Sequence, residues 1–431
     1  MAQAVPLIIA QLVQLLYNIV DRIYIGHLPD IGSLALTGIG LTFPFTTLVL
    51  AFAALFGTGG APLFSIARGA KEDEKARRIL GNAFTLTLIF SVCLMVVFFL
   101  FRVPLLYLFG ASDATIVYAE NYLSIYLIGV IFSMTATAMN SFITALGFPR
   151  IAMWTTVIGA VLNLILDPIF IFAFSMGVRG AALGTVISQC VSAIWVLRFL
   201  IAREKDFPIR LTYMRLKAQT VREILALGIS GFIQQATNFV VQIVCNRTLQ
   251  IYGGDLYVGI MTIVSSVREI ASLPVLGLTS GAQPVLGFNY GAKENERVKE
   301  GIRFMSIAGI LYTLVIWAAI EAVPGAFVHI FSSDAQTLVS GIPAMRIYFL
   351  GFVFMSLQFI GQYIFVGLGK AKRAIFFSIL RKIIIVVPLT LVLPLCWGLG
   401  ATGVFLAEPI SNVIGGLACF LTMWFTLYRK L

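Results

Sequence analysis

The sequence predicts an all-α integral membrane protein whose twelve transmembrane helices form two six-helix lobes, related by a pseudo-two-fold axis along the membrane normal. Three observations lead to this prediction. Of the 431 residues, 59% are hydrophobic and 11% are charged, whereas about 25% of the residues in a soluble domain are charged. The apolar residues gather in long stretches. The second half of the chain also repeats motifs of the first half.

The apolar stretches have the length of membrane spans, because a helix needs about 20 apolar residues to cross a bilayer. The first stretch has no basic segment before it and holds Asp21 at depth, so we expect a retained span rather than a signal peptide. In chain order, the twelve predicted spans are residues 5–26, 34–57, 79–101, 116–143, 151–174, 180–201, 224–249, 257–281, 302–323, 338–366, 373–394 and 401–427.

The composition argues against several classes of site. Two histidines, His27 and His329, are too few for a His-based zinc site, and the five cysteines form no C-x-x-C pair. The sequence has no G-x-x-x-x-G-K-[ST] loop and no dinucleotide fingerprint. We therefore expect a protein that is not an enzyme, that has no cofactor and that does not hydrolyse ATP within this chain.

Lys and Arg are distributed unevenly between the two sets of loops. Most lie in the loops after the even-numbered spans and at the C-terminus, whereas the opposite loops hold Arg22, Arg102 and Arg179, with Arg247 near a span end. The positive-inside rule then predicts a multi-pass cell-membrane protein with both termini in the cytoplasm. The net charge of +11 would face anionic lipid headgroups, so we expect a lipid bilayer, and no nucleic acid, as partner.

The internal repeat defines two lobes, 1–201 and 220–431, joined by a basic cytoplasmic linker, 202–219. Because six spans precede the repeat, both halves begin on the same side, and parallel repeats of this kind place a substrate site near the midplane between them. Nothing indicates the carbonyl filter or charged ring of a channel, so a transporter is favoured. The matching positions are Gly69-Ala70-Lys71 with Gly291-Ala292-Lys293 and Gly147 with Gly369, 222 residues apart, and Gly177, Gly180, Ile187 and Ser188 with Gly400, Gly403, Ile410 and Ser411, 223 apart.

Span 1 carries a polar stripe. Spacings of 3, 4 and 3 place Gln11, Gln14, Asn18 and Asp21 on one helical face. Amides in membrane helices often hold helices together, which is our interpretation of Gln11. A charge at the bilayer centre costs at least about 2.5–3.5 kcal/mol on insertion scales, so Asp21 favours a functional role.

Span 5 contains Asn163 and Asp167, followed by Pro168. The i, i+4 spacing places both side chains on one face, and the proline frees a backbone carbonyl one turn earlier. These hard oxygen ligands suit a bare cation, whereas an acid in a desolvated site near a second carboxylate also suits a proton. The pattern alone could equally cap or kink a structural helix, so both interpretations remain open here.

The second half does not repeat these acids. Span 7 repeats the polar stripe as Gln235, Asn238 and Gln242, but Cys245 stands where span 1 has Asp21. Span 11 has no counterpart of the Asn163–Asp167 pair. We therefore predict ion coupling in the N-terminal lobe alone.

Other polar residues in the spans have structural interpretations. Asn140 in span 4 and Gln362 in span 10 are expected to hold helices together. Arg381 and Lys382 are placed in the first turns of span 11, from where long side chains can snorkel to the interface. Glu408, beside Pro409 in span 12, is our second choice of a functional acid, after Asp21 and Asp167.

Together these residues resemble the multidrug and toxic compound extrusion (MATE) family, in its prokaryotic branch. Each motif is weak alone, but the resemblance extends over essentially the whole chain. The motifs are Tyr17-Asn18-x-x-Asp21, Gly69-Ala70-Lys71 with its copy Asn289-Tyr290-Gly291-Ala292-Lys293, Ala145-Leu146-Gly147, Asn163-x-x-x-Asp167-Pro168, and Gly177-x-x-Gly180-Ala181-Ala182-x-Gly184-Thr185-x-Ile187-Ser188 with its copy ending Pro409-Ile410-Ser411.

The resemblance implies a V-shaped pair of bundles, expected to act as a monomer, that exports amphiphilic, often cationic, drugs in exchange for Na⁺ or H⁺. It carries the family's cation site onto Asp21, Asn163, Asp167 and Thr185, where Na⁺ would bind. Tyr17, Asn18, Gln14 and Asn140 are expected to support that site or line the substrate pathway. Some family members carry acids in the seventh and tenth spans, where this chain has amides, which also argues against a C-lobe ion site.

The alternative function is a flippase for lipid-linked oligosaccharides with a related two-lobe architecture. Such a flippase would line its central cleft with Arg and Lys for pyrophosphate, and the deep basic candidates in the sequence are Arg268 and Arg346. The sequence does not name the drugs or choose between Na⁺ and H⁺.

Overall fold

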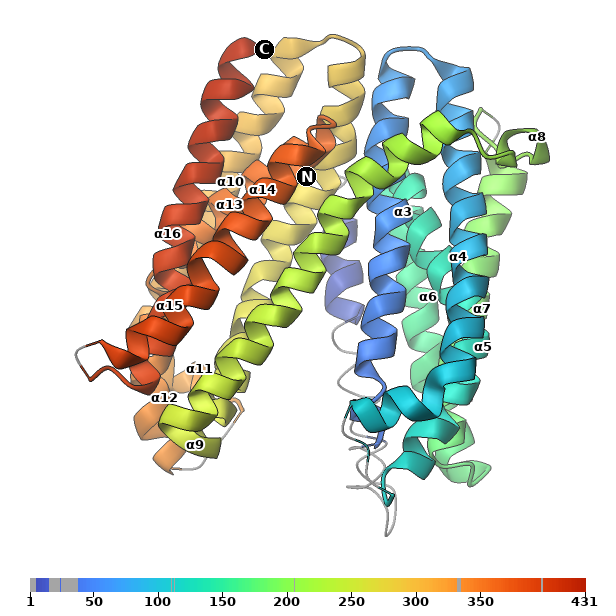
Figure 1. Cartoon of the computed structure of the whole chain (residues 1–431). Helices are drawn as coiled ribbons and strands as arrows, with labels where there is room; N and C mark the ends of the chain where they lie inside the picture. Colours follow the sequence, from blue (N-terminus) through green and yellow to red (C-terminus); the bar gives the residue numbers. More distant parts are fainter. Residues whose placement is uncertain are drawn as a thin grey trace. The chain divides into compact units, whose positions relative to one another are not determined.

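The computed structural model describes residues 5–14, 24, 38–109, 111, 113–204, 206–331, 335–396 and 398–431, and every regular element in these ranges is a helix (Figure 1). By its contacts the chain divides into two compact units, Ala2–Gly228 and Ile229–Leu431. The all-α prediction is confirmed.

Among its described residues, the first unit contains the five long helices α3 to α7. Within it, α5 packs against α3, α4 and α7, and α6 packs against α7. The elements are a helix over Val5–Gln14, α3 Phe43–Gly69, α4 Asp73–Leu108, α5 Ile116–Ala145, α6 Pro149–Pro168, the π-helix η1 Ile169–Ala173, α7 Val178–Arg198, the π-helix η2 Phe199–Arg203, the short α8 Leu211–Met214 and the start of α9 Ala218–Gly291.

The second unit begins inside α9. This helix turns at Gly254, where the backbone has a φ of 64°, so α9 supplies two spans, Ala218–Gly254 and Leu256–Gly291. The remaining elements are α10 Asn295–Ala322, α11 Pro324–His329, α12 Ala335–Phe349, α13 Phe352–Gly367, α14 Ala371–Ile379, the π-helix η3 Leu380–Val386, α15 Val387–Val392, η4 Leu393–Leu395, α16 Ala401–Thr426 and η5 Tyr428–Lys430.

Eleven of the twelve predicted spans have counterparts among the described residues. Ten helices there are long and apolar enough to cross a membrane, and α12 with α13 makes one further span, bent by 45°. Of the first predicted span, Val5–Gln14 is an apolar helix, and most of the rest lies outside the described residues. Large apolar side chains on the outer faces, such as Leu100, Ile128 and Leu311, are more than half exposed, as expected for surfaces that face lipid.

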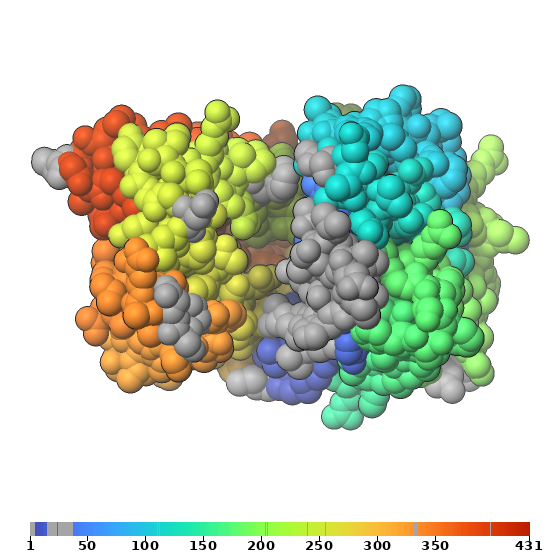
Figure 2. Space-filling model, turned by 90° about the horizontal axis from the view of Figure 1, so that it is seen from below, coloured from blue at the N-terminus to red at the C-terminus, as the bar shows by residue number. Residues whose placement is uncertain are grey.

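Inside each unit the helices pack closely. In the first unit Phe45, Phe56, Phe64 and Phe142 are almost fully buried. In the second unit one apolar cluster surrounds Phe349 and Phe405, and another surrounds Phe365. Figure 2 shows the outer surface of each unit from below, with parts of α9 and α12 on the second unit and of α4 and α7 on the first.

The sequence repeat corresponds to a repeat of backbone turns. After α3, the Lys71 amide donates to Arg68 O (3.0 Å) and the Glu72 amide to Ala67 O (2.9 Å). After α9, the amides of Lys293 and Glu294 make the same two bonds, of 3.1 and 2.9 Å. Each turn is a Schellman motif, with Lys71 and Lys293 at φ values of 60° and 61°.

A second pair of turns explains the repeated glycines before the last span of each half. Gly177 and Gly400 precede α7 and α16 with φ values of 54° and 51°, a region that glycine adopts readily. Gly180 and Gly403 then contact the backbone of the preceding segment directly. The repeated motif therefore marks a tight return of the chain into the last span.

Candidate functional site

The predicted polar pair of span 5 forms a buried cluster in the first unit. Asn163 and Asp167 lie on the last turns of α6, and Thr185 lies on the neighbouring α7. The Asn163 amide donates to Asp167 Oδ1 (2.8 Å) and approaches Thr185 Oγ1 at 3.4 Å. All three residues are less than 5% exposed. The i, i+4 spacing and the adjacent helix therefore bring a carboxylate, an amide and a hydroxyl together, as predicted.

A glycine on α7 allows this close packing. A Cβ atom at Gly184 would overlap Asp167 Oδ1, so the carboxylate occupies the space that any other residue would fill. The helix also changes form at the acid. Pro168 ends α6 and the π-helix η1 follows, and π-helical turns often lie at functional sites.

The cluster adjoins a cavity of about 590 Å³ within the first unit. Asn163 and Thr185 line this cavity, together with Gln14 and Asn140, whereas Asp167 reaches it through its hydrogen bond to Asn163. None of the described lining residues is charged, and they include the rings of Phe43, Tyr122 and Tyr126 beside several Thr and Ser hydroxyls. The wall is thus neutral and partly aromatic, with one carboxylate directly behind it.

Asn140 links two helices and also lines the cavity. Its side-chain amide donates to Ala152 O across to α6 (3.1 Å), so it holds two helices together. Its Oδ1 oxygen is buried with no hydrogen-bond partner among the described residues. An oxygen without a partner in the wall of a cavity can accept a hydrogen bond or coordinate a cation.

Three of the predicted site residues, Tyr17, Asn18 and Asp21, lie outside the described residues. Gln14, at the end of the helix Val5–Gln14, lines the cavity as expected for the stripe of span 1. The described residues contain no group of three or more His, Cys, Asp and Glu side chains suited to a metal ion. Among the described residues, the oxygens available to a cation at this cluster are the amide, hydroxyl and backbone oxygens beside the Asp167 carboxylate.

The second unit holds a buried charge cluster that the sequence did not indicate. Arg381 and Lys382, both in η3, bond the same oxygen, Oε1 of Glu408 on α16, at 3.0 and 3.2 Å. Arg381 also donates to Asn412 Oδ1 (2.7 Å). The charged residues of this cluster are 5–6% exposed, so the expectation that Arg381 and Lys382 snorkel to the interface is wrong.

Arg381 and Lys382 stay buried because they lie deep within their helical segment and have a carboxylate partner there. The helical segment begins at Ala371, so Arg381 is ten residues inside it, about 15 Å along the axis at 1.5 Å per residue. The arginine stem also lies against Gly415 of α16, where a side chain would displace it. Gln362 behaves as expected, because its amide bonds Ser378 Oγ at 2.6 Å and links α13 to α14.

Comparison with known proteins places the chain in a family. The family model described as MatE matches residues 6–169 and 228–392, one block in each half. The chain belongs to the MatE family. This family is the one that the sequence motifs indicated, and its members among the solved structures are transporters.

Relatives and solved structures agree with this assignment. The "Multidrug export protein MepA" of Staphylococcus saprophyticus is 26% identical over 421 residues, covering 98% of this chain and 92% of the relative. The protein of the same name from Staphylococcus aureus (strain NCTC 8325 / PS 47) is 25% identical, with the same coverage. An outward-facing MATE transporter of the MOP superfamily superposes with a TM-score of 0.92 at 24% identity, covering 100% of this chain and 96% of that one. MATE in complex with MaL6 gives a TM-score of 0.93 at 23% identity, with the same coverage.

Within this MatE protein, Gln189 is among the wall residues of the first-unit cavity that sequence reasoning missed. Gln189 lines the N-unit cavity, and its Oε1 oxygen is buried with no hydrogen-bond partner among the described residues. Gln189 follows Thr185 by four residues on α7, so the two share a face. That spacing was a signal in the sequence that could have identified it.

Proposed function

We propose that this chain is a secondary active multidrug efflux antiporter, which exports amphiphilic or cationic organic compounds in exchange for Na⁺ or H⁺ by alternating access of two lobes. One observation carries the proposal. The carboxylate of Asp167 is buried with Asn163 and Thr185, directly behind the wall of a large cavity. A buried acid beside a cavity in a membrane transporter marks an ion or substrate pathway.

The cavity in the first unit suits the proposed substrates. Its volume of about 590 Å³ lies within the range of about 300–1,000 Å³ that is common for small-molecule sites. Tyr and Phe rings in the wall would contact an apolar body and attract a cationic group. The names of the staphylococcal relatives, which are multidrug export proteins, agree with this substrate class.

The cluster supplies what coupling requires. The coupling ion must bind one conformation of the transporter more tightly than the other, because equal affinity would shift no equilibrium. Asp167 and its neighbours are held by hydrogen bonds within one helix and between two, so a small helix movement would change the ion's ligands. Asp21, expected to complete the site, is part of this proposal. Binding of the ion to the outward-open state would then displace drug and favour the inward-open state.

The proposal also covers the location, oligomeric state and partners of the protein. The excess of Lys and Arg in one set of loops supports a cell-membrane protein with both termini on the cytoplasmic side. The chain would act as a monomer, with the lipid bilayer and the exported drug as its partners. No chemical step is required, so the protein would not be an enzyme.

The test is ethidium efflux from vesicles that contain the purified full chain, under a Na⁺ gradient and, separately, a pH gradient. We expect one gradient to drive efflux, and Asp167→Asn to abolish it while leaving membrane insertion unchanged. Asp113→Asn is the matched control, because Asp113 is an exposed acid of the same unit that bonds only Tyr107 among the interactions described. Efflux that persists in Asp167→Asn at the wild-type rate would overturn the proposed ion site.

The same experiment addresses the flippase alternative, for which no movement of dye under either gradient would be the signature. The basic residues of the second unit do not favour it. Arg268 and Lys382 line a cavity of only about 110 Å³, which is too small for a pyrophosphate-linked sugar.

A further inference from the structure

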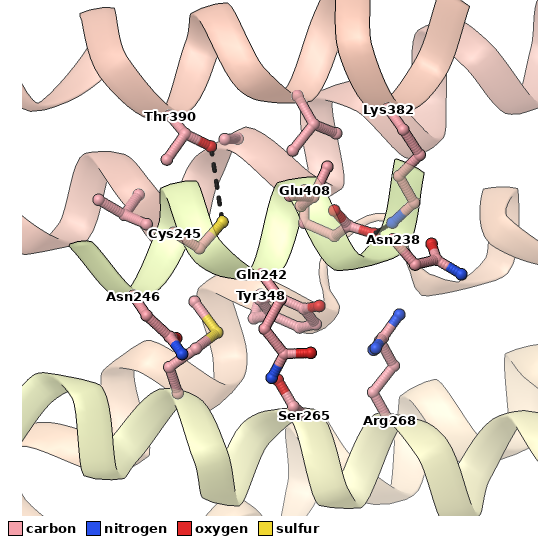
Figure 3. Close-up of a pocket in the computed structure, with 15 residues that line it drawn as sticks. Asn238, Gln242, Cys245, Asn246, Ser265, Arg268, Tyr348, Lys382, Thr390 and Glu408 are labelled. Atoms are coloured by element: carbon pink, nitrogen blue, oxygen red, sulfur yellow. Dashed lines mark hydrogen bonds and ion pairs between the residues drawn. The ribbon is translucent and has the colours of Figure 1, made fainter. Parts of the chain in front are cut away.

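A second cavity lies within the unit Ile229–Leu431 and is lined mainly by polar side chains (Figure 3). The two halves of α9 contribute Asn238 and Gln242 on one side and Ser265 and Arg268 on the other. Lys382 of η3 and Glu408 of α16 close the wall between them. In Figure 3 Lys382 points toward Glu408, and Arg268 points into the cavity from the opposite helix.

Positive charge exceeds negative charge around this cavity. Glu408 is already held by Arg381, which lies outside the cavity wall and is anchored in turn by Asn412. The same Glu408 oxygen is the described ion-pair partner of Lys382. Arg268 adds a third cation. This residue is partly exposed, but its Nε atom is buried with no hydrogen-bond partner among the described residues. The exposed Glu269 beside Arg268 does not line the cavity, and even when it is counted the cations outnumber the carboxylates by three to two.

Buried charges in folded proteins are paired, because an unpaired ion loses its hydration without compensation. The groups that face this cavity are also mostly donors. Lys382 and Arg268 have only N–H donors, and the amides of Asn238 and Gln242 can each donate two hydrogen bonds. The amide oxygens and the Glu408 carboxylate are acceptors, but Arg381 and Lys382 already bond Glu408. The remaining N–H donors can therefore bind an anion.

The size of the space limits the ligand. A volume of about 110 Å³ lies well below the range of drug-sized sites. It has room for a halide or a carboxylate group with associated water. The excess of one or two positive charges matches a single negative charge on the ligand.

We propose that the cavity between Arg268, Lys382 and Glu408 is an anion site, which binds a small monovalent anion, either a halide or a carboxylate. The anion is the missing counterion of Arg268 and Lys382 and completes the buried cluster. This site is separate from the proposed cation site of the first unit, and its occupancy does not depend on drug export. A carboxylate could be a free ion or the anionic end of a larger amphiphile, and the experiment below separates these sources.

Binding can be measured without transport, on the purified full chain in nanodiscs at constant ionic strength with sodium isethionate, which has no carboxylate, as the background salt. Titration calorimetry with sodium bromide and sodium acetate should show one site per chain. Arg268→Gln should weaken the binding of both anions at least tenfold, and so should Lys382→Gln. Arg346→Gln is the matched control, because this arginine of the same unit is 53% exposed and lies 4.0 Å from Glu321; its affinity should equal that of the wild type.

Two further variants keep the result interpretable. Gln242→Leu removes a neutral donor from the wall without disturbing the Glu408 ion pairs, so it tests the site even if Lys382→Gln does not fold. Asp167→Asn should leave anion binding unchanged, which separates a failure of this site from a failure of the proposed function. Tighter binding of octanoate than of acetate, lost in Arg268→Gln, would assign the site to the end of an amphiphile. Equal affinity would assign it to a free ion.

The proposal would be overturned if the wild-type chain bound neither bromide nor acetate up to molar concentration. It would also be overturned if Arg268→Gln and Gln242→Leu bound both anions with the affinity of the wild type. Crystals soaked in bromide give an independent check, because the anomalous signal should lie between Arg268 and Lys382.

Discussion

The last two spans of each half contain a buried carboxylate, but the partner of the first carboxylate is neutral and the partners of the second are cationic. Asp167 of the first unit accepts a hydrogen bond from the neutral amide of Asn163. Glu408 of the second unit is bonded by two cations, Arg381 and Lys382. The offset of 223 that relates Ile187 to Ile410 also relates Thr185 to Glu408.

The two halves therefore share the backbone geometry of the repeat but differ in the chemistry of their buried sites. The negative charge of Glu408 is already neutralised by Arg381 and Lys382, so a coupling cation would gain little by binding there. A carboxylate beside an amide and a hydroxyl leaves that role open. This difference supports the proposed ion coupling in the first unit and the proposed anion site in the second.

The largest difference should appear when each acid is made neutral. Glu408→Gln leaves two buried cations without their carboxylate, and breaking a buried ion pair costs about 3–5 kcal/mol. Asp167→Asn keeps an acceptor oxygen opposite Asn163 and should cost at most about 1 kcal/mol, the net contribution of one hydrogen bond. Thermal unfolding of the two purified variants measures the contrast.

Glu296→Gln is the control for this pair of variants. Glu296 forms an ion pair with Lys299, but the Glu296 side chain is 87% exposed. Exposed pairs contribute about 0–1 kcal/mol, so this variant should unfold like the wild type. Equal stability of Glu408→Gln and Glu296→Gln would contradict the buried cluster.

Gly184→Ala would give the first unit the residue that the second unit has at the corresponding position. Gly184 corresponds to Ala407 by the same offset, and Gly184→Ala places a methyl group where Asp167 Oδ1 now lies. Overpacking of this kind costs about 1–3 kcal/mol, and the displaced carboxylate should lower gradient-driven dye efflux. The readouts are unfolding temperature and efflux rate. Gly259→Ala is the control, since nothing lies within 4 Å of a Cβ there. Wild-type efflux in Gly184→Ala would show that the position of the carboxylate is unimportant.

The smallest effect is expected at Thr185. Thr185→Val keeps the shape of the side chain and removes the hydroxyl, which lies 3.4 Å from the Asn163 amide. A hydrogen bond contributes about 0.5–1.5 kcal/mol, and this long one should be at the low end. If the hydroxyl is also an ion ligand, the ion concentration for half-maximal efflux should rise while stability hardly changes. An unchanged ion dependence would remove Thr185 from the site.

Much of the fold could be predicted from the sequence because the signals are local. Apolar length identified eleven spans that the described residues contain, and the repeated Gly-Ala-Lys motif marks the same hydrogen-bonded turn in both halves. The pair Asn163 and Asp167 was predicted from i, i+4 spacing alone, which needs no knowledge of other helices. Thr185 came from the family resemblance, and its place beside Asn163 is a contact between two helices.

The charge cluster of the second unit could not be predicted in the same way. Whether Arg381 and Lys382 snorkel or stay inside depends on a partner on another helix, 27 and 26 residues away along the chain. The π-helical form of η3 and the absence of a side chain at Gly415 decide how closely α16 approaches. Neither is visible in a pattern of hydropathy. The direction of the Glu408 side chain cannot be predicted from the sequence for the same reason.

The twin turns at Lys71 and Lys293 have a consequence for how the chain enters the membrane. A left-handed backbone costs a non-glycine residue roughly 1–2 kcal/mol, and glycine would adopt it freely. Both copies nevertheless carry lysine at a φ near 60°, in loops expected to remain in the cytoplasm. Positive charge in short loops is what orients a nascent membrane protein. We therefore expect each turn to combine a strained backbone in the finished fold with a charge that acts earlier, while the spans are being inserted.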